Sequence, residues 1–206
     1  MNTRQTISDE ESEAVVRLFE GISKAEGWQP GNQLRAHTTR SAYFGVWSNQ
    51  SGIPGQDILV GGLQLVSPDC GRFPSHLVWP ELPVAENNAP TLHAAVLAVL
   101  PEFRGKDGAA AFWSLGIALW RHCVENGVKA VYLEATPKML RCYRLLGWPL
   151  EVIGELREHW GEPCYPCRLS VRDVAGSLAE RSLRSTTYRG IFTAAIQPGV
   201  TVANPA

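Results

Sequence analysis

The sequence of 206 residues has almost no net charge and no long apolar run. Its 19 Lys and Arg residues are matched by 20 Asp and Glu residues, which gives a formal charge of −1 and no general attraction to nucleic acid or to anionic membranes. A membrane-spanning helix needs roughly 20 consecutive apolar residues, and no segment approaches that length. The N-terminal segment is polar and acidic, unlike a secretory signal. We therefore expect a cytoplasmic protein whose partners are neither nucleic acids nor membranes.

The cysteine content argues against a disulfide scaffold and against a metal site. Five cysteines are present, and the one CxxC pair is Cys164 and Cys167. A structural zinc site normally uses a second such pair, which the sequence lacks. A redox pair usually begins a helix, whereas this segment has the pattern of a strand. We interpret these residues as structural thiols and expect no metal ion.

Two common phosphate-binding motifs are also missing. The sequence contains neither the GxxxxGK[ST] loop of P-loop proteins nor the GxGxxG turn of dinucleotide-binding folds. Neither class of nucleotide site is therefore predicted.

The sequence does contain a regular succession of helices and strands. Ser8 followed by Glu11 is a capping box, and it begins an amphipathic helix that Gly27 ends. Apolar runs at 42–47 and 57–66 predict two strands that pair as a hairpin. The later predicted elements are a buried central strand at 91–100, a helix at 109–125, a strand at 128–133, a helix at 137–146, and strands at 150–153 and 167–171. This order predicts a mixed α/β sheet.

The chain is expected to form one main domain over residues 1–172. Residues 173–206 are expected to form a C-terminal extension, with one possible helix at about 173–184 and an irregular tail.

The segment PEFRGKDGAAAFWSL (101–115) connects the central strand to the next helix. Unpaired N–H groups at a helix N-terminus can bind an anion, and the small residues here would let a phosphate approach the backbone. Asp107 would oppose a phosphate, although its carboxylate could also cap the helix. From spacing alone, a phosphate site and an ordinary turn both remain open.

Tyr143 is the second feature that could carry chemistry. It lies four residues before the helix-ending Gly147, on a helix that follows a strand. Its phenol could donate a proton to a leaving thiolate. Taken alone, the residue could equally pack the helix on the sheet.

Together, VLPEFRGKDGA (99–109) and TPKMLRCYRLLGW (136–148) resemble the acyl-CoA-dependent N-acyltransferase (GNAT) superfamily. Its donor loop reads R/Q-x-x-G-x-G/A after the fourth strand, and a later helix carries Y-x-x-x-G-F. ILVGGLQLV (58–66), SHLVWPEL (75–82) and the run from Gly147 to Glu162 resemble the acyl-homoserine lactone (autoinducer) synthase branch more closely. The resemblance covers about 57–171, more weakly from about residue 15.

The resemblance implies an α/β (α+β) fold, with a mixed, mostly antiparallel central sheet flanked by helices and with splayed central strands. It implies an N-acyltransferase that moves an acyl group from a thioester to the amine of a small molecule. The co-substrate would be acyl-CoA or acyl-phosphopantetheine on an acyl carrier protein, with no tightly bound cofactor. Specialised metabolism is one setting for such a reaction.

Roles for individual residues follow from the same resemblance. Tyr143 would protonate the leaving thiolate, and either His93 or Glu134 would take the proton from the amine. The alternatives are that His93 is an ordinary core histidine and that Glu134 is a solvated carboxylate. The groups expected to hold the donor and the oxyanion are Val99, Arg104, Gly105, Lys106, Gly108 and Ala109. The other four histidines are interpreted as non-catalytic, namely His37, His76, His122 and His159.

The sequence departs from the autoinducer synthase pattern at its acceptor positions. The strand arginine of those enzymes corresponds to Gln64, and their Glu-x-x-Arg falls near His93 and Val96. Gln29–Thr39 contains no Asp or Glu. S-adenosylmethionine is therefore not the expected acceptor. An autoinducer synthase and a catalytically inactive binding module of the same fold remain the alternatives.

A basic group could recognise an acidic carrier protein. It comprises Arg104, Lys106, Lys138, Arg141 and Arg144. Ordinary solvated helix charges are the alternative interpretation.

Overall fold

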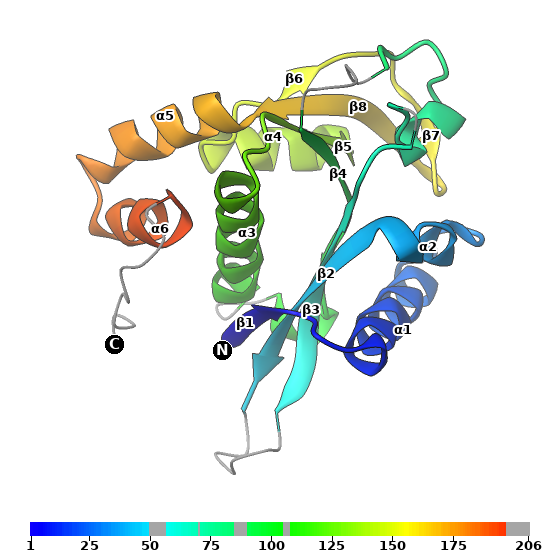
Figure 1. Ribbon diagram of the computed structural model, residues 1–206, viewed down its shortest axis with the longest axis horizontal. Coiled ribbons are helices and arrows are strands. Elements are labelled where there is room, and N and C mark those ends of the chain that lie inside the picture. The colour runs from blue at the N-terminus through cyan, green and yellow to red at the C-terminus, as the bar shows by residue number, and fades with distance from the viewer. Residues whose placement is uncertain (50–56, 70, 85–89, 105–107, 197–206) are drawn as a thin grey trace.

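The computed structural model describes residues 1–49, 57–69, 71–84, 90–104 and 108–196. Over these residues the chain forms an eight-stranded sheet with helices on both faces (Figure 1). The strand order is β1-β2-β3-β4-β5-β8-β6, and β7 pairs with β8 outside this path. The strands are β1 Asn2–Gln5, β2 Ser41–Ser48, β3 Ile58–Val66, β4 Thr91–Val99, β5 Ala130–Ala135, β6 Glu151–Val152, β7 Arg157–His159 and β8 Glu162–Ser170. Among the described strands, only β4 and β5 pair in parallel, which confirms the predicted mixed, mostly antiparallel sheet.

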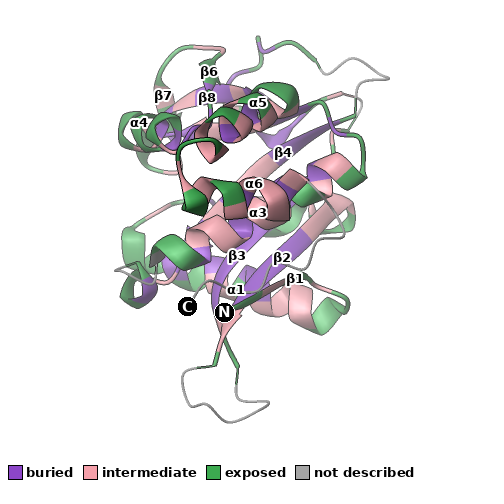
Figure 2. Cartoon of the chain, turned by 90° about the vertical axis from the view of Figure 1, so that its left-hand side faces the viewer, coloured by how far each residue is buried: buried purple, intermediate pink, exposed green. Residues whose placement is uncertain are grey.

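The helices form two layers around this sheet. They are α1 Asp9–Glu26, α2 Gln33–Ala36, α3 Gly108–Glu125, α4 Pro137–Leu145, α5 Val171–Ser182 and α6 Thr186–Ile196. In Figure 1, α1 and α2 lie on one side of the strands, and α3 lies on the other side with α6 packed against it. Figure 2 shows that the buried residues concentrate on the strands between these layers.

The helix α1 forms as its sequence predicts. The Ser8 hydroxyl accepts a hydrogen bond from the Glu11 N–H at 3.1 Å, and the Glu11 carboxylate accepts one from the Ile7 N–H at 2.9 Å. The Ser8 half of the capping box satisfies an amide that has no partner inside the helix, whereas the Glu11 half reaches Ile7, one residue before the cap. Gly27 ends the helix with φ 75°, in the left-handed region that glycine adopts without steric cost.

The two central strands separate after a short parallel ladder. Their register runs from Thr91 opposite Ala130 to His93 opposite Tyr132, although both strands continue beyond these pairs. On its other edge β4 stays paired with β3, with an irregularity that leaves Ala95 as an extra residue between Ala94 and Val96. The predicted splayed central strands are therefore present.

The extra residue changes which side chains share a face. Ala94 and Leu97 pack with the large core under α3, whereas Ala95 and Val96 both pack with the core under α1. Two consecutive β4 residues thus point to the same face, as a β-bulge requires.

The C-terminal part of the chain contains two helices where the sequence predicts one. The buried residues Val174 and Leu178 of α5, and Ile191 of α6, belong to the same core as α3. The boundary at residue 172 stays a prediction, and the tail beyond Pro198 lies outside the described residues.

Three other short elements are absent from the sequence-based expectations. They are β1, α2 and β7, which have four, four and three residues. Such short segments carry too few residues for a periodic pattern, and neighbouring strands or helices supply their stability.

Candidate active site

A cavity of about 670 Å³ lies where β4 and β5 separate. Its lining residues come from both faces of the sheet. The part under α3, here called the α3 end, includes Ala94, Leu97, Phe112, Leu119, Leu133 and Tyr143. The part on the opposite face, here called the α1 end, includes Trp28, Ala95, Glu134, His159, Trp160 and Glu162. The cavity therefore connects the two faces of the sheet through the gap between its central strands.

Strand alternation explains why Glu134 faces the α1 end. Its neighbours Leu133 and Ala135 belong to the core under α3, so the side chain between them points to the other face. In β8 the same rule separates Leu169, in the α3 core, from Cys164, which packs with Trp79 on the opposite side.

Glu134 and His93 form a buried hydrogen-bonded pair beside the cavity. His93 Nε2 lies 3.0 Å from Glu134 Oε1, and their side chains are only 2% and 7% exposed. Because a carboxylate can only accept, Nε2 carries the proton in this contact. Burial alone would raise the pKa of the Glu134 carboxyl, but His93 and a hydrogen bond from the Ser75 hydroxyl outweigh it and hold that pKa well below its usual range. Glu134 is therefore ionised at neutral pH, and it lines the cavity, whereas His93 lies behind it.

His159 joins this group, although the sequence analysis interpreted it as non-catalytic. It is buried, lines the cavity and acts electrostatically on Glu134. Burial lowers the pKa of His159, against the opposing effect of the Glu134 carboxylate. The two residues are 25 positions apart in the sequence and come near each other because β8, which follows β7 in a hairpin, pairs with β5. No local motif could have indicated this electrostatic interaction.

Tyr143 lies at the α3 end within a stack of aromatic rings. Its ring is 5.2 Å from that of Trp148, with only 4° between the planes, and 6.0 Å from that of Phe112. Burial raises the pKa of the Tyr143 phenol, so the hydroxyl keeps its proton at neutral pH. A phenol held in this way can act as a proton donor.

The backbone of Val99 presents its amide to the gap between the strands. The Leu100 N–H donates to the Val60 carbonyl at 2.9 Å, and Val99 is opposite Gly61. In an antiparallel ladder this pattern turns the N–H and C=O of Val99 away from β3, toward the side from which β5 has diverged. The Val99 carbonyl accepts a hydrogen bond from Arg104 Nε at 2.8 Å. Its N–H likewise points away from β3.

Two tryptophans form a wall of the α1 end. Trp28 follows the C-cap of α1, and Trp160 lies at the two-residue turn between β7 and β8. Trp160 has φ 54°, an uncommon conformation for a bulky residue, and it is followed by Gly161 at φ 86°. Positive φ at both positions is typical of a type I′ hairpin turn. The Gln29 N–H donates to the Trp160 carbonyl at 3.0 Å, which joins the hairpin to the segment after Trp28.

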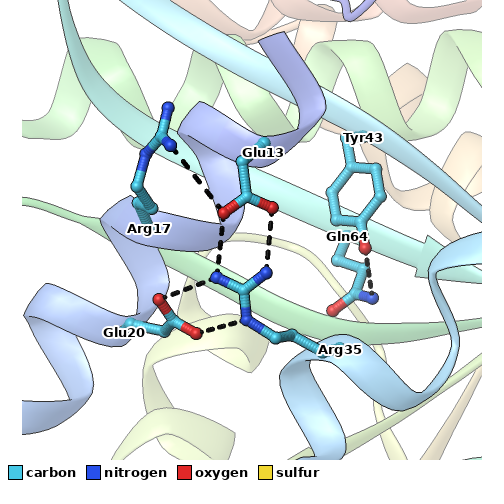
Figure 3. Close-up of polar contacts among 6 residues, drawn as sticks. All are labelled: Glu13, Arg17, Glu20, Arg35, Tyr43 and Gln64. Carbon is cyan, nitrogen blue, oxygen red and sulfur yellow. Dashed lines mark hydrogen bonds and ion pairs between the residues drawn. The ribbon is translucent and has the colours of Figure 1, made fainter. Parts of the chain in front are cut away.

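The position of Trp160 depends further on α2. Its indole Nε1 donates to Gln33 Oε1 at 3.0 Å. In the same helix, Arg35 pairs with the Glu13 and Glu20 carboxylates of α1 at 2.9 and 2.7 Å (Figure 3). This double ion pair joins α2 to α1.

Gln64, which occupies the position of the strand arginine of autoinducer synthases, has a structural role. It is buried in β3, and its amide donates to the Tyr43 hydroxyl at 3.1 Å (Figure 3). The same amide donates to the Ser41 hydroxyl at 3.0 Å. These contacts satisfy the amide within the hairpin, away from the cavity lining.

The predicted donor-binding residues are described in part. Ala109, Arg104 and Val99 line the cavity, and Gly108 begins α3. The Arg104 guanidinium also pairs with Glu26 of α1. Gly105, Lys106 and Asp107 lie outside the described residues.

The remaining sequence-based expectations concern metals, thiols and membranes. The described residues contain no group of three or more His, Cys, Asp or Glu placed to hold a metal ion. Cys164 and Cys167 are buried in β8, and burial raises the pKa of both thiols to about 12. No helix among the described residues is long and apolar enough to span a bilayer. A cytoplasmic location stays a prediction.

No family model and no curated protein sequence matches this chain. Solved structures do match its fold. FeeM, an N-acyl amino acid synthase from uncultured soil microbes, superposes with a TM-score of 0.64 at 15% identity, over 85% of this chain and 93% of FeeM. TofI, in a complex with an inhibitor and MTA, superposes with a TM-score of 0.63 at 14% identity, over 87% of this chain and 97% of TofI. BjaI, a CoA-dependent acyl-homoserine lactone synthase with SAM and isopentyl-CoA, superposes with a TM-score of 0.59 at 12% identity, over 84% of this chain and 82% of BjaI. The chain therefore has a GNAT-like fold, similar to that of the acyl-homoserine lactone synthase branch.

Proposed function

We propose that this chain is an N-acyltransferase that moves an acyl group from an acyl thioester to the amine of a small molecule. The observation that carries the proposal is the cavity between β4 and β5, which has an ionised Glu134 at one end and a protonated Tyr143 at the other. Aminolysis of a thioester needs a proton acceptor for the amine and a proton donor for the thiolate, on opposite sides of the carbonyl carbon.

The reaction follows from this arrangement. The amine enters at the α1 end, where Glu134 accepts its proton directly or through water as the N–C bond forms. The tetrahedral oxyanion takes a hydrogen bond from the Val99 N–H. As the C–S bond breaks, Tyr143 gives its proton to the thiolate. The products are an amide and a free thiol, and proton exchange with solvent returns Glu134 to its ionised form and Tyr143 to its protonated form. His93 acts as a positioning residue that holds the Glu134 carboxylate.

The donor would be acyl-CoA or acyl-phosphopantetheine on a carrier protein. Its phosphate would lie at the N-terminus of α3, where Gly108 and Ala109 leave the backbone accessible and the helix dipole favours an anion. Lys138 lines the cavity at the start of α4 and adds a positive charge.

The acyl chain would occupy the α3 end. Its apolar lining extends along α3 from Ala109 to Leu119, a separation of ten residue steps that spans about 15 Å at 1.5 Å per residue. This length, together with the volume of about 670 Å³, favours an acyl group longer than acetyl.

Replacement of Tyr143 by Phe tests the proposal. The purified protein is incubated with acyl-CoA thioesters of increasing length and a panel of amines, while free thiol is measured and the amide is identified by mass spectrometry. We expect Tyr143→Phe to lower kcat about 10²–10⁴-fold, the usual contribution of a general acid. Tyr165→Phe is the matched control, because Tyr165 is a half-buried β8 residue outside the cavity lining. Amide formation that is unchanged in Tyr143→Phe would refute the role of the phenol.

A second candidate is an acyl-homoserine lactone synthase, which the structural likeness to TofI and BjaI favours. It predicts the release of methylthioadenosine from S-adenosylmethionine with an acyl donor. An absence of release with every donor would exclude it. If no thioester is consumed with any acceptor, the catalytically inactive binding module becomes the better interpretation.

A further inference from the structure

The α1 end of the cavity differs from a site built for an amino acid. Its described polar lining includes the carboxylates of Glu134 and Glu162 and the imidazole of His159. The two indoles Trp28 and Trp160 supply flat apolar surface beside them. An amino-acid acceptor would bring a carboxylate into this group, and that carboxylate would need a cationic partner.

The described cations that line the cavity are Arg104 and Lys138. Arg104 already donates to the Val99 carbonyl and pairs with Glu26, so its charge is compensated within the protein. Lys138 belongs to the first turn of α4, the helix that carries Tyr143 at the α3 end. Among the described lining residues, Arg104 is therefore already paired, and the proposed function assigns Lys138 to the phosphate of the donor.

The indole wall is held in place by several contacts. Trp160 adopts a positive φ, its carbonyl accepts from the Gln29 N–H, its Nε1 donates to Gln33, and its ring stacks on His159 at 4.9 Å. Backbone strain in a bulky residue persists only where the surroundings determine it, and such positions are enriched at ligand sites. The Trp160 side chain is half-buried and lines the cavity, so the arrangement leaves an aromatic surface for a ligand.

We propose that the acceptor is a primary arylalkylamine without a carboxylate, with its ring against Trp28 and Trp160 and its amine at Glu134. This inference rests on the proposed acyl-transfer function and specifies its substrate class. Indole faces bind flat rings and cations favourably, and the carboxylates attract an ammonium group. The same carboxylates would repel the carboxylate of the corresponding amino acid, so discrimination comes from repulsion as well as attraction.

Matched pairs of ligands that differ only in the carboxylate test the proposal. They are tyramine against tyrosine and tryptamine against tryptophan. Equilibrium binding to the wild-type protein is measured by isothermal titration calorimetry, without an acyl donor, and acyl transfer is then measured with the same ligands. We expect the amine of each pair to bind at least about tenfold more tightly and to have the higher kcat/KM. Equal binding, binding that favours the amino acid, or no measurable binding of either amine would overturn the inference.

Reversing the charge of Glu162, at the α1 end of the cavity, provides a second test. Glu162→Lys supplies the missing cation, and we expect it to reduce the preference for tyramine over tyrosine at least about fivefold. Glu158→Lys is the matched control, because Glu158 is an exposed β7 residue outside the cavity lining. An equal preference in both variants would show that Glu162 does not contact the acceptor, and would overturn its part in the inference.

The two proposals can fail separately. If tyrosine is acylated faster than tyramine, the acyl-transfer function stands and the acceptor class is wrong. If tyramine binds more tightly than tyrosine but no amide forms with any donor, the amine site stands and the acyl-transfer function is wrong.

Discussion

The two ends of the cavity are built in different ways. The α3 end consists of apolar side chains from regular elements, mainly α3, α4 and the strands beneath them. The α1 end gathers polar and aromatic residues from the end of α1, from β5 and from the tip of the β7–β8 hairpin. One end therefore offers a binding surface of apolar area, and the other offers charge and hydrogen bonding. Under the proposed function, an apolar substrate group and a polar one would lie on opposite faces of the sheet.

The two ends also differ in how accurately their side chains must be placed. An apolar pocket tolerates changes of substrate length, because each methylene contributes about 0.8 kcal/mol without a directional requirement. Glu134, by contrast, depends on His93 and Ser75 for its ionised state. We therefore expect substitution of Glu134 to affect the chemical step, and substitutions of the apolar residues at the α3 end to affect the choice of donor.

The largest expected effect comes from Glu134→Gln. Loss of a general base typically costs about 10²–10⁴-fold, and we expect kcat for amide formation to fall within this range. The amide oxygen of Gln can still accept from His93 Nε2, so the buried imidazole keeps a partner. The measurement is single-turnover amide formation at saturating donor and amine.

Glu151→Gln is the control for this substitution. Glu151 is an exposed β6 residue that pairs with Arg168 at 3.3 Å, and it lies outside the cavity lining. Its replacement should leave kcat unchanged. If Glu134→Gln keeps the wild-type rate while its fold is intact by circular dichroism, then Glu134 is structural and the comparison between the two ends fails.

A pair of neighbouring substitutions separates the two ends directly. Ala94 and Ala95 are adjacent in β4 and both line the cavity, and strand alternation directs them to opposite faces. We expect Ala94→Leu to lower kcat/KM for the longest acyl donors about tenfold and to affect short donors less. Ala95→Leu should raise KM for the amine instead.

Each variant is the control of the other, since both add the same side chain. Steady-state kinetics with the donor varied and then with the amine varied distinguish the two effects. If both substitutions alter the same kinetic parameter, donor and acceptor do not occupy opposite ends.

The sequence predicted the elements that depend on local signals. The capping box at Ser8 and the αL glycine at position 27 determine the limits of α1, and both act within a few residues. The hairpin of β2 and β3 follows from two apolar runs around a turn-rich segment. The splayed strands were expected from the family resemblance, since neither strand by itself indicates where pairing ends.

The α1 end depends on contacts between distant segments, and these were missed. The β7–β8 turn places Trp160 at positive φ, where Gly, Asn or Asp is usual. The residue types at this position therefore do not indicate a hairpin turn. Gly161 after Trp160, between two residues that pair, is the one local feature that could have indicated the hairpin. The roles of Tyr143, Glu134, His93 and the donor-loop residues stay predictions.

The smallest expected effect concerns the support of the α1 end. Gly62 of β3 lies under α1, and a Cβ added there would come within 2.8 Å of Val15 Cγ1 and 2.9 Å of Phe19 Cε1. These atoms belong to buried core residues of α1, so Gly62→Ala must displace the helix that ends beside Trp28. We expect the free energy of unfolding to fall by about 1–3 kcal/mol, as for other overpacked cores.

Gly21→Ala is the matched control, because a Cβ at Gly21 would meet no atom within 4 Å. In a helix interior this substitution should raise the free energy of unfolding by about 0.5–1 kcal/mol. Urea denaturation measures both changes. Kinetics at a temperature where both variants are folded should show a raised KM for the amine in Gly62→Ala alone, with the donor KM unchanged. A donor KM that rises with the amine KM would show that α1 supports the whole cavity and not one end of it.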